Sequence, residues 1–139
     1  IATDSYSIGY LLLSSELEIR TGNNQITKWL ERPLDTYIGQ EVTEAFAELV
    51  GSADLITSLS VASGPYRLAE IYRPSENDMG NYFDLQIMRL EGEAGELLLT
   101  TVDVTHKARQ EQTLQQQRNE LKLLSAELAY TNERLTYIL

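Results

Sequence analysis

The sequence predicts an α+β domain that is built on an antiparallel sheet and followed by a long C-terminal helix. Two strand-like segments come first, a block of short helical segments follows, and three more strand-like segments precede the long helix. Strands that are separated by a block of helices, instead of alternating with them, indicate an antiparallel sheet. Beyond residue 106, leucines recur every seven residues, at positions 114, 121, 128 and 135. We therefore expect a globular domain at residues 1–105 and a helix at residues 106–139.

The first half of the domain contains two strands and several short helices. The strands are expected at residues 9–13 and 16–20, where apolar residues cluster or alternate. Residues 21–24 have the turn chemistry that suits a helix cap. From residue 25 to about residue 62 the apolar spacing is helical, but Pro33 and Gly39 interrupt it. This region should therefore form several short helices instead of one long helix.

The last three strands are expected at residues 66–72, 81–90 and 96–104. A polar segment at residues 74–80 joins the first two, and a glycine-containing turn at residues 91–95 joins the last two. The final strand runs directly into the long helix, with no flexible linker between them.

The long helix has the repeat of a coiled coil. Its 34 residues would span about 50 Å, and a leucine at every seventh position stays on one seam only if the helices supercoil. Placing these leucines at heptad position a gives the core residues Leu114, Gln117, Leu121, Leu124, Leu128, Thr131, Leu135 and Ile138. Six of these eight residues are apolar, so this register and a homodimer through the helix are preferred.

Two alternatives for the helix stay open. Leucines at heptad position d would place four polar residues at position a, namely Glu111, Arg118, Ser125 and Asn132. A long amphipathic helix that folds back on its own domain would have similar spacing. In the preferred register, Gln117 and Thr131 weaken the core, which suits a coil that can change its arrangement.

The charge distribution limits the kinds of molecule that the domain can bind. Residues 106–139 hold five Lys/Arg and four Asp/Glu, whereas residues 1–105 hold six and 17, a net charge of −11. Affinity for nucleic acid rests largely on Lys and Arg that displace counterions, so we expect no DNA or RNA partner. No apolar run is long enough to span a membrane. We expect a soluble, cytoplasmic fragment of a longer protein, which itself could be membrane-tethered.

Composition also limits the cofactors. The absence of cysteine excludes disulfides, iron–sulfur ligation and a cysteinyl adduct with flavin. The single histidine, His106, lies at the start of the long helix, outside any expected pocket, which disfavours a His-ligated haem. It is followed by Lys107, whereas a phosphoacceptor histidine is typically followed by an acidic residue. The cofactor is therefore unknown: non-covalent flavin, a small organic acid and no ligand are all compatible with the sequence.

No catalytic or metal site is expected, so this fragment is predicted not to be an enzyme. Its carboxylates near strand ends and turns resemble solvated rims, namely Glu16, Glu18, Glu91, Glu93 and Glu96. Four aromatic residues are large enough to line a ligand pocket, namely Trp29, Tyr72, Tyr82 and Phe83. A tryptophan in a small domain is equally compatible with a core position.

Several residues, taken together, resemble a PAS domain. Their order and spacing match that family over residues 8–105, and the helix resembles a PAS signalling linker. The residues that carry the resemblance are Ile19, Asn23, Leu30, Pro33, Tyr37-Ile38-Gly39-Gln40, Gly92, Gly95 and Asp103-Val104-Thr105. Glu31 departs from the pattern, because many members have glycine there.

The resemblance implies a five-stranded antiparallel sheet in the order 2-1-5-4-3, with short helices on one face around a ligand pocket. It also implies that Asp103-x-Thr105 couples the last strand to the helix, and that Asp103 pairs with a downstream basic residue, here Arg109. The residues themselves agree: Thr105 can cap the helix, and a half-buried Asp103 needs a cation to offset its desolvation. A plain helix cap without a signalling role is the alternative.

The function implied by the resemblance is a sensory or signal-relay module. Such a module dimerises and transmits a conformational signal through its coiled coil to an effector in the same full-length chain. That effector would be a histidine kinase of a two-component system or a diguanylate cyclase. The alternative is a purely structural dimerisation or protein-interaction module with no ligand.

Overall fold

The computed structural model describes residues 8–75 and 78–138, with side chains at all of these except residues 75, 78 and 136–138. The chain divides after Val104 into two compact units. The first unit is a mixed domain of strands and short helices, and the second is a single helix.

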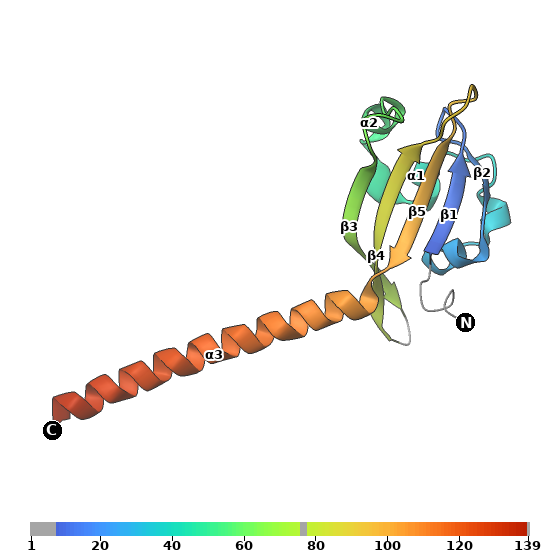
Figure 1. The fold of residues 1–139 in the computed structure, drawn as a ribbon. Helices are drawn as coiled ribbons and strands as arrows, with labels where there is room; N and C mark the ends of the chain where they lie inside the picture. Colours follow the sequence, from blue (N-terminus) through green and yellow to red (C-terminus); the bar gives the residue numbers. More distant parts are fainter. Residues whose placement is uncertain (1–7, 76–77, 139) are drawn as a thin grey trace. The chain divides into compact units, whose positions relative to one another are not determined.

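The domain contains one five-stranded sheet in the order β2-β1-β5-β4-β3 (Figure 1). All neighbouring strands are antiparallel. This confirms the predicted fold class and strand order. The strands are β1 (Ile8–Leu13), β2 (Ile19–Gly22), β3 (Tyr66–Ser75), β4 (Asp78–Arg89) and β5 (Leu97–Asp103).

The second strand begins later than the sequence predicts. Glu16 and Leu17 lie in a turn, where the Ser14 hydroxyl accepts hydrogen bonds from the backbone N–H groups of Glu16 and Glu18. Leu17 takes a positive φ of 69° and is nevertheless buried. The expected alternation over residues 16–20 is therefore wrong for its first half, because a side chain that reaches the core from a turn looks like a strand residue in the sequence.

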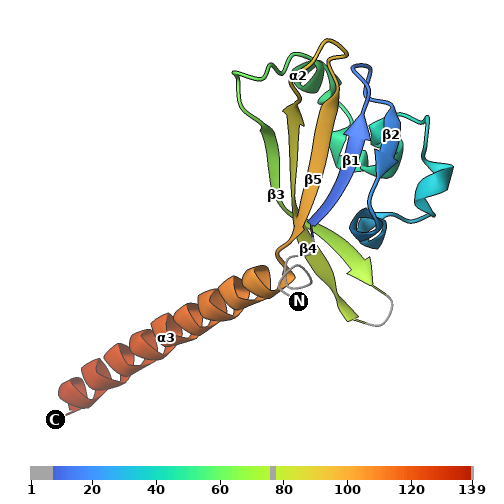
Figure 2. The same cartoon turned by 45° about the vertical axis from the view of Figure 1, so that its right-hand side comes forward.

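Five short helices follow β2, and all of them lie on one face of the sheet (Figures 1 and 2). Asn23 caps the first helix, because its side-chain oxygen accepts a hydrogen bond from the N–H of Ile26. The helices are η2 (Asn24–Trp29), η3 (Leu34–Thr36), α1 (Val42–Ala45), η4 (Ala47–Leu49) and α2 (Ala53–Thr57).

The core lies between the sheet and these helices. The side chains that fill it from the two layers are buried, with at most 2% of their surface exposed, and include Leu11, Leu13, Ile19, Ile26, Trp29, Val42, Phe46, Leu49, Ile56, Phe83, Leu85, Ile87, Leu97 and Leu99. Helix η2 packs closely on β1 at Gly9, where an added Cβ would lie 2.8 Å from the Cα of Ile26. Only glycine fits this position.

Strands β3 and β4 continue past β5 as a two-stranded hairpin (Figure 2). In this part the Tyr72 and Tyr82 rings are in contact, with centroids 5.2 Å apart and planes tilted by 55°. The Tyr72 hydroxyl donates to the carbonyl of Met79. Gly80 has φ +88°, and a Cβ there would lie 2.5 Å from the Tyr72 ring. The hairpin therefore holds the tyrosine against a glycine backbone.

The second unit is α3 (Thr105–Ile138), a continuous helix of 34 residues. Only Val104 separates it from the end of β5, so no flexible linker lies between strand and helix, as the sequence predicts.

Candidate functional site

The end of β5 forms the first part of the candidate site. The Asp103 carboxylate accepts a hydrogen bond and ion pair from the Lys28 ammonium group of η2. The Asp103 side chain is only 17% exposed, so this cation offsets the cost of its partial desolvation. In the next residue, the Val104 N–H donates to the carbonyl of Tyr82 at 3.0 Å. The last strand is thus fixed to the helical layer and to β4 at the point where it ends.

The cation predicted for Asp103 was Arg109, and the structure adds Lys28. Pairing with Arg109, and the signalling role of Asp103, Thr105 and Arg109, stay predictions. Thr105 is the first residue of α3, and Arg109 lies about one turn further along that helix. Lys28 was missed because it is distant in sequence, although a basic residue in the last turn of a short helix is a recognisable feature.

An aromatic cluster forms the second part of the site, directly beside Lys28. The Lys28 ammonium lies 5.1 Å from the centroid of the Trp29 ring. Trp29 packs on Phe83 with centroids 4.4 Å apart, and Phe46 meets the same ring edge-on at 6.0 Å. All three rings are buried. A continuous set of contacts therefore runs from the aromatic core through Lys28 to the end of β5.

The aromatic cluster contains an unsatisfied polar atom. The indole Nε1 of Trp29 has no hydrogen-bond partner among the described residues, and the Thr101 hydroxyl on β5 has none either. Both side chains are buried, and burial of an unpaired polar group is costly. The ring contacts of Trp29 favour a core position.

A half-buried ion pair closes one side of this cluster. The Arg73 guanidinium of β3 donates to both carboxylate oxygens of Glu48 in η4, with Nη2 2.9 Å from Oε1. Its Cζ atom lies 5.3 Å from the Phe83 centroid, and its Nε donates to the carbonyl of Trp29 at 3.4 Å. The hydrogen bonds from Arg73 hold the pKa of Glu48 below its ordinary value, and they outweigh the opposing effect of burial.

The four aromatic residues predicted to line a ligand pocket do not share one face. Successive residues of a strand point to opposite faces, so Phe83 points into the core with Trp29, whereas Tyr82 points the other way with Tyr72. Tyr72 is 46% exposed in the hairpin. A single pocket lined by all four is therefore not formed, because the prediction grouped them by size and not by strand alternation. A pocket role for Trp29 and Phe83 stays a prediction.

The predicted seam residues of α3 are exposed in the single chain. The exposed fraction is 48% for Leu114, 63% for Leu121 and Leu128, 56% for Leu124 and 53% for Leu135. The side chain of Ile138 lies outside the described part of the structure. An exposed apolar seam of this length on one helix is a surface that a partner can cover.

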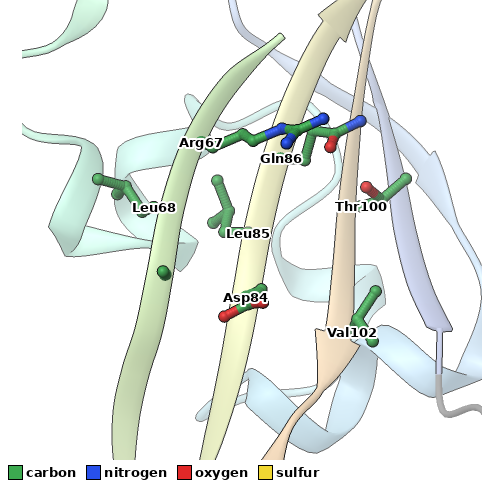
Figure 3. Close-up of a pocket in the computed structure, with 8 residues that line it drawn as sticks. Arg67, Leu68, Asp84, Leu85, Gln86, Thr100 and Val102 are labelled. Carbon is green, nitrogen blue, oxygen red and sulfur yellow. The ribbon is translucent and has the colours of Figure 1, made fainter.

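The sheet face opposite the helices carries a hollow of about 380 Å³ (Figure 3). It lies over β4, between β3 and β5. The lining residues are Arg67, Leu68, Ala69, Asp84, Leu85, Gln86, Thr100 and Val102. The sequence contained no signal for this hollow, because it depends on how β3 pairs with β4. A β-bulge interrupts that pairing between Leu68 and Ile71.

Within the described residues, no group of three or more His, Asp or Glu side chains is placed to hold a metal ion. No helix in the described part of the chain is long and apolar enough to cross a membrane.

A five-stranded antiparallel sheet in the order 2-1-5-4-3, with short helices on one face, defines the PAS fold. Comparison with solved structures agrees. The chain is similar to a sensory box sensor histidine kinase from Vibrio cholerae, with 16% identity over 70% of this chain and 82% of that chain, at a TM-score of 0.52. It is also similar to the PAS domain of a protein from Colwellia psychrerythraea, with 18% identity over 76% and 92% of the two chains, at a TM-score of 0.51.

A third similar structure is the PAS domain of the RpfR quorum-sensing receptor from Cronobacter turicensis, in complex with BDSF. It has 17% identity over 71% of this chain and 95% of that chain, at a TM-score of 0.50. No protein-family model and no curated protein matches the sequence. At these identities the likeness establishes the fold, and this chain has the PAS fold.

Proposed function

We propose that this chain is a sensory or signal-relay PAS module that forms a homodimer through α3. It transmits a conformational signal through a coiled coil to an effector in the full-length protein, a histidine kinase or a diguanylate cyclase. The observation that carries the proposal is the direct continuation of β5 into a helix with a leucine at every seventh position. The fragment itself acts by changing shape and not by catalysis.

The contacts at the end of β5 suggest a route for the signal. Asp103 is tied through Lys28 to η2, and η2 carries Trp29 in the aromatic cluster. A change of packing in that cluster would move Lys28 and with it the anchor of β5. A coupling of about 1 to 3 kcal/mol between core and coil would change an output 5- to 150-fold. We place Thr105 and Arg109 in the same transmission element.

The coil is tested by replacing both Leu121 and Leu128 with Ser. Each leucine that a partner helix covers contributes about 1 to 2 kcal/mol, since it is already partly buried in the single chain. Four leucines are lost per dimer, so we expect the dimer to weaken by about a thousandfold or more. Leu123→Ser is the matched control, because Leu123 is 66% exposed but lies off the predicted seam. Sedimentation at micromolar concentration should find monomer for the double variant and dimer for the control; an unchanged dimer would reject the coil.

Transmission is tested by Asp103→Ala in the full-length protein. We expect the domain to stay folded, because Asp103 is at the end of its strand, while the effector stops responding to its signal. Lys28→Met should have the same effect through loss of the same ion pair. An effector that still responds normally in both variants would rule out the proposed route.

The alternative is a structural dimerisation module with no ligand. The close packing of Trp29 on Phe83 favours a core that holds no ligand. One structural neighbour was solved with a small molecule, BDSF, so a ligand for this chain is a direct question for experiment. The absorbance spectrum of the purified protein tests for a chromophore, and mass spectrometry after denaturation tests for colourless ligands. Crosslinking of α3 with and without signal distinguishes the relay from the structural module.

A further inference from the structure

The hollow on the outer face of the sheet lies beside an irregular stretch of β3. A bulge interrupts the pairing of β3 with β4 between Leu68 and Ile71, and within it Glu70 takes a φ of +52°. The Glu70 N–H donates to the Oδ1 atom of Asp84 at 2.8 Å. The neighbouring Ala69 has only a methyl group as its side chain at this wall of the hollow. The volume of about 380 Å³ is in the range of small-molecule sites.

The hollow carries a positive charge that has no partner. Arg67 extends across β4 toward Gln86, which is its cross-strand neighbour (Figure 3). Residues 1–105 contain six Lys and Arg side chains, and four of them have a carboxylate, carbonyl or aromatic partner, namely Lys28, Arg32, Arg73 and Arg89. Among the described residues, Arg20 and Arg67 have no such partner. In a strongly acidic domain, a guanidinium that is left unpaired in a hollow is available to an anionic group.

Asp84 provides the opposite charge in the same hollow. Its Oδ1 atom accepts from the Glu70 N–H, whereas within the described residues no hydrogen bond or ion pair occupies its Oδ2 atom. Asp84 precedes Gln86 by two positions on β4, so their backbones are about 7 Å apart on the same face. In the described structure, Arg67 and Asp84 form no ion pair with each other. The hollow thus presents a separate guanidinium and carboxylate, together with the Gln86 amide and the Thr100 hydroxyl.

This charge pattern selects among small ligands. A phosphate or another multiply charged anion would be repelled by Asp84 and by the acidic domain. A simple carboxylate would pair with Arg67 but would leave Asp84 without a partner. A molecule with both a carboxylate and an ammonium group satisfies both side chains and brings no net charge to the domain.

We propose that the hollow binds a small zwitterion, an amino acid whose carboxylate and ammonium groups lie several ångström apart. The Arg67 guanidinium donates two hydrogen bonds to the carboxylate, a geometry that its planar shape favours. The ammonium group donates to the Oδ2 atom of Asp84, and the alkyl chain lies against Ala69 and Val102. Because Arg67 is exposed, solvent screens these charges, and we expect an affinity in the millimolar range.

The site is separate from the aromatic cluster of Trp29, Phe46 and Phe83, which lies on the other face of the sheet. It includes Thr100 and Val102 of β5, close to the point where that strand leads into α3. A ligand in the hollow would therefore give the proposed relay an input at its last strand. This consequence rests on the proposed function, whereas the binding itself does not.

The probe for the site is 4-aminobutyrate, in which three methylene groups separate the carboxylate from the ammonium. Its two controls are butyrate, which lacks the ammonium, and butylamine, which lacks the carboxylate. Titration of the full chain, followed by amide chemical shifts in NMR spectra, measures the three affinities. We expect 4-aminobutyrate to bind about tenfold more tightly than either control, with the largest shifts at Arg67, Gln86 and Thr100. Equal affinities, or no binding at tens of millimolar, would overturn the proposal.

Arg67→Gln and Asp84→Asn each remove one charge from the hollow. Asp84→Asn keeps a side-chain oxygen for the Glu70 N–H, so the bulge should be retained. Each variant should weaken the binding of 4-aminobutyrate about tenfold and keep the amide spectrum of a folded domain. The matched control is Arg20→Gln, which removes the other arginine without a partner, on β2, and should leave the affinity unchanged. Binding that survives both hollow variants, or that Arg20→Gln weakens equally, would contradict the proposed site.

Two further measurements separate this site from the core and from the coil. The chain contains a single tryptophan, so the indole N–H of Trp29 gives one signal that reports on the core. This signal should stay in place during the titration; a shift larger than those of the hollow would locate the ligand in the core and overturn the proposal. The double variant with Leu121→Ser and Leu128→Ser should bind the probe with unchanged affinity, because every group of the site belongs to one domain. A monomer that still binds would support the site and reject the coil, whereas loss of binding in this variant would overturn a site within one chain.

Discussion

Replacing Glu48 by Gln removes the charge that faces the Arg73 guanidinium while it keeps the size of the side chain. The two side chains are only 27% and 23% exposed, and Arg73 donates to both carboxylate oxygens. Exposed ion pairs contribute about 0.2 to 1 kcal/mol, and hydrogen bonds to charged groups about 1.5 to 3 kcal/mol. For this half-buried pair we expect Glu48→Gln to lower the free energy of unfolding by about 1.5 kcal/mol.

The same change should be visible by heating and should depend on pH. For a domain of this size, about 1.5 kcal/mol corresponds to a fall of about 6 to 12 °C in Tm. The pKa of Glu48 is lowered by folding, so its stabilisation is fully present above the pKa of an unfolded glutamic acid. The stabilisation is lost as the pH falls through the lower pKa of the folded state. The difference between wild type and Glu48→Gln should therefore be constant near neutral pH and shrink in acid.

Thermal unfolding followed by circular dichroism at several pH values measures this difference. The control is Glu44→Gln, which changes an exposed carboxylate of α1 that has no ion pair among the described residues. Arg73→Met and the double variant complete a thermodynamic cycle and isolate the interaction of the pair. A difference that is the same at all pH values, or an equal effect of Glu44→Gln, would refute the role given to the ion pair.

Two further predictions concern polar side chains in and beside the core. Asn23→Ala should lower the free energy of unfolding by about 2 kcal/mol, because its side chain bonds the backbone of Tyr10 and Ile8 in β1 and also caps η2. Denaturant unfolding measures this loss, and Asn24→Ala, at the exposed neighbour, should be nearly neutral. Thr101→Val should be neutral or stabilise the domain by up to about 1 kcal/mol, since the buried hydroxyl has no partner in the described structure. A clear loss of stability in the same assay would mean that this hydroxyl is hydrogen-bonded in solution.

Local patterns were sufficient to predict the five strands, their antiparallel class and the long helix, whereas the spatial strand order followed from the resemblance to a PAS domain. Apolar runs, turn residues and Pro33 predicted the block of short helices. Asn23 has the helix-capping role that its position indicated. The second strand was misplaced because Leu17 reaches the core from a turn with positive φ, a conformation that leucine rarely takes. The hydrophobic side chain of Leu17 does not indicate that its backbone takes a positive φ.

The candidate site was less accessible to sequence reasoning, because its contacts join distant segments. Lys28 and Asp103 are 75 residues apart, and Arg73 and Glu48 are 25 apart. Arg89 similarly donates to the carbonyls of Thr57 at the end of α2, Leu59 just after that helix, and Gly95 in the turn between β4 and β5. A charged residue in a strand has many eligible partners, and only the three-dimensional arrangement selects among them. The aromatic residues show the same limit: residue size suggested a pocket, whereas strand alternation separated them.

The irregular edge strand β3 has a consequence for how the protein can aggregate. At Glu70 the backbone turns to φ +52°, and its N–H is occupied by the Asp84 carboxylate of the neighbouring strand at 2.8 Å. Further along, Pro74 has no N–H to offer. A strand interrupted in both ways is a poor template for a foreign strand, which discourages open-ended, fibre-like growth of the sheet. Association is thereby directed away from the sheet edge and toward surfaces that can form closed assemblies.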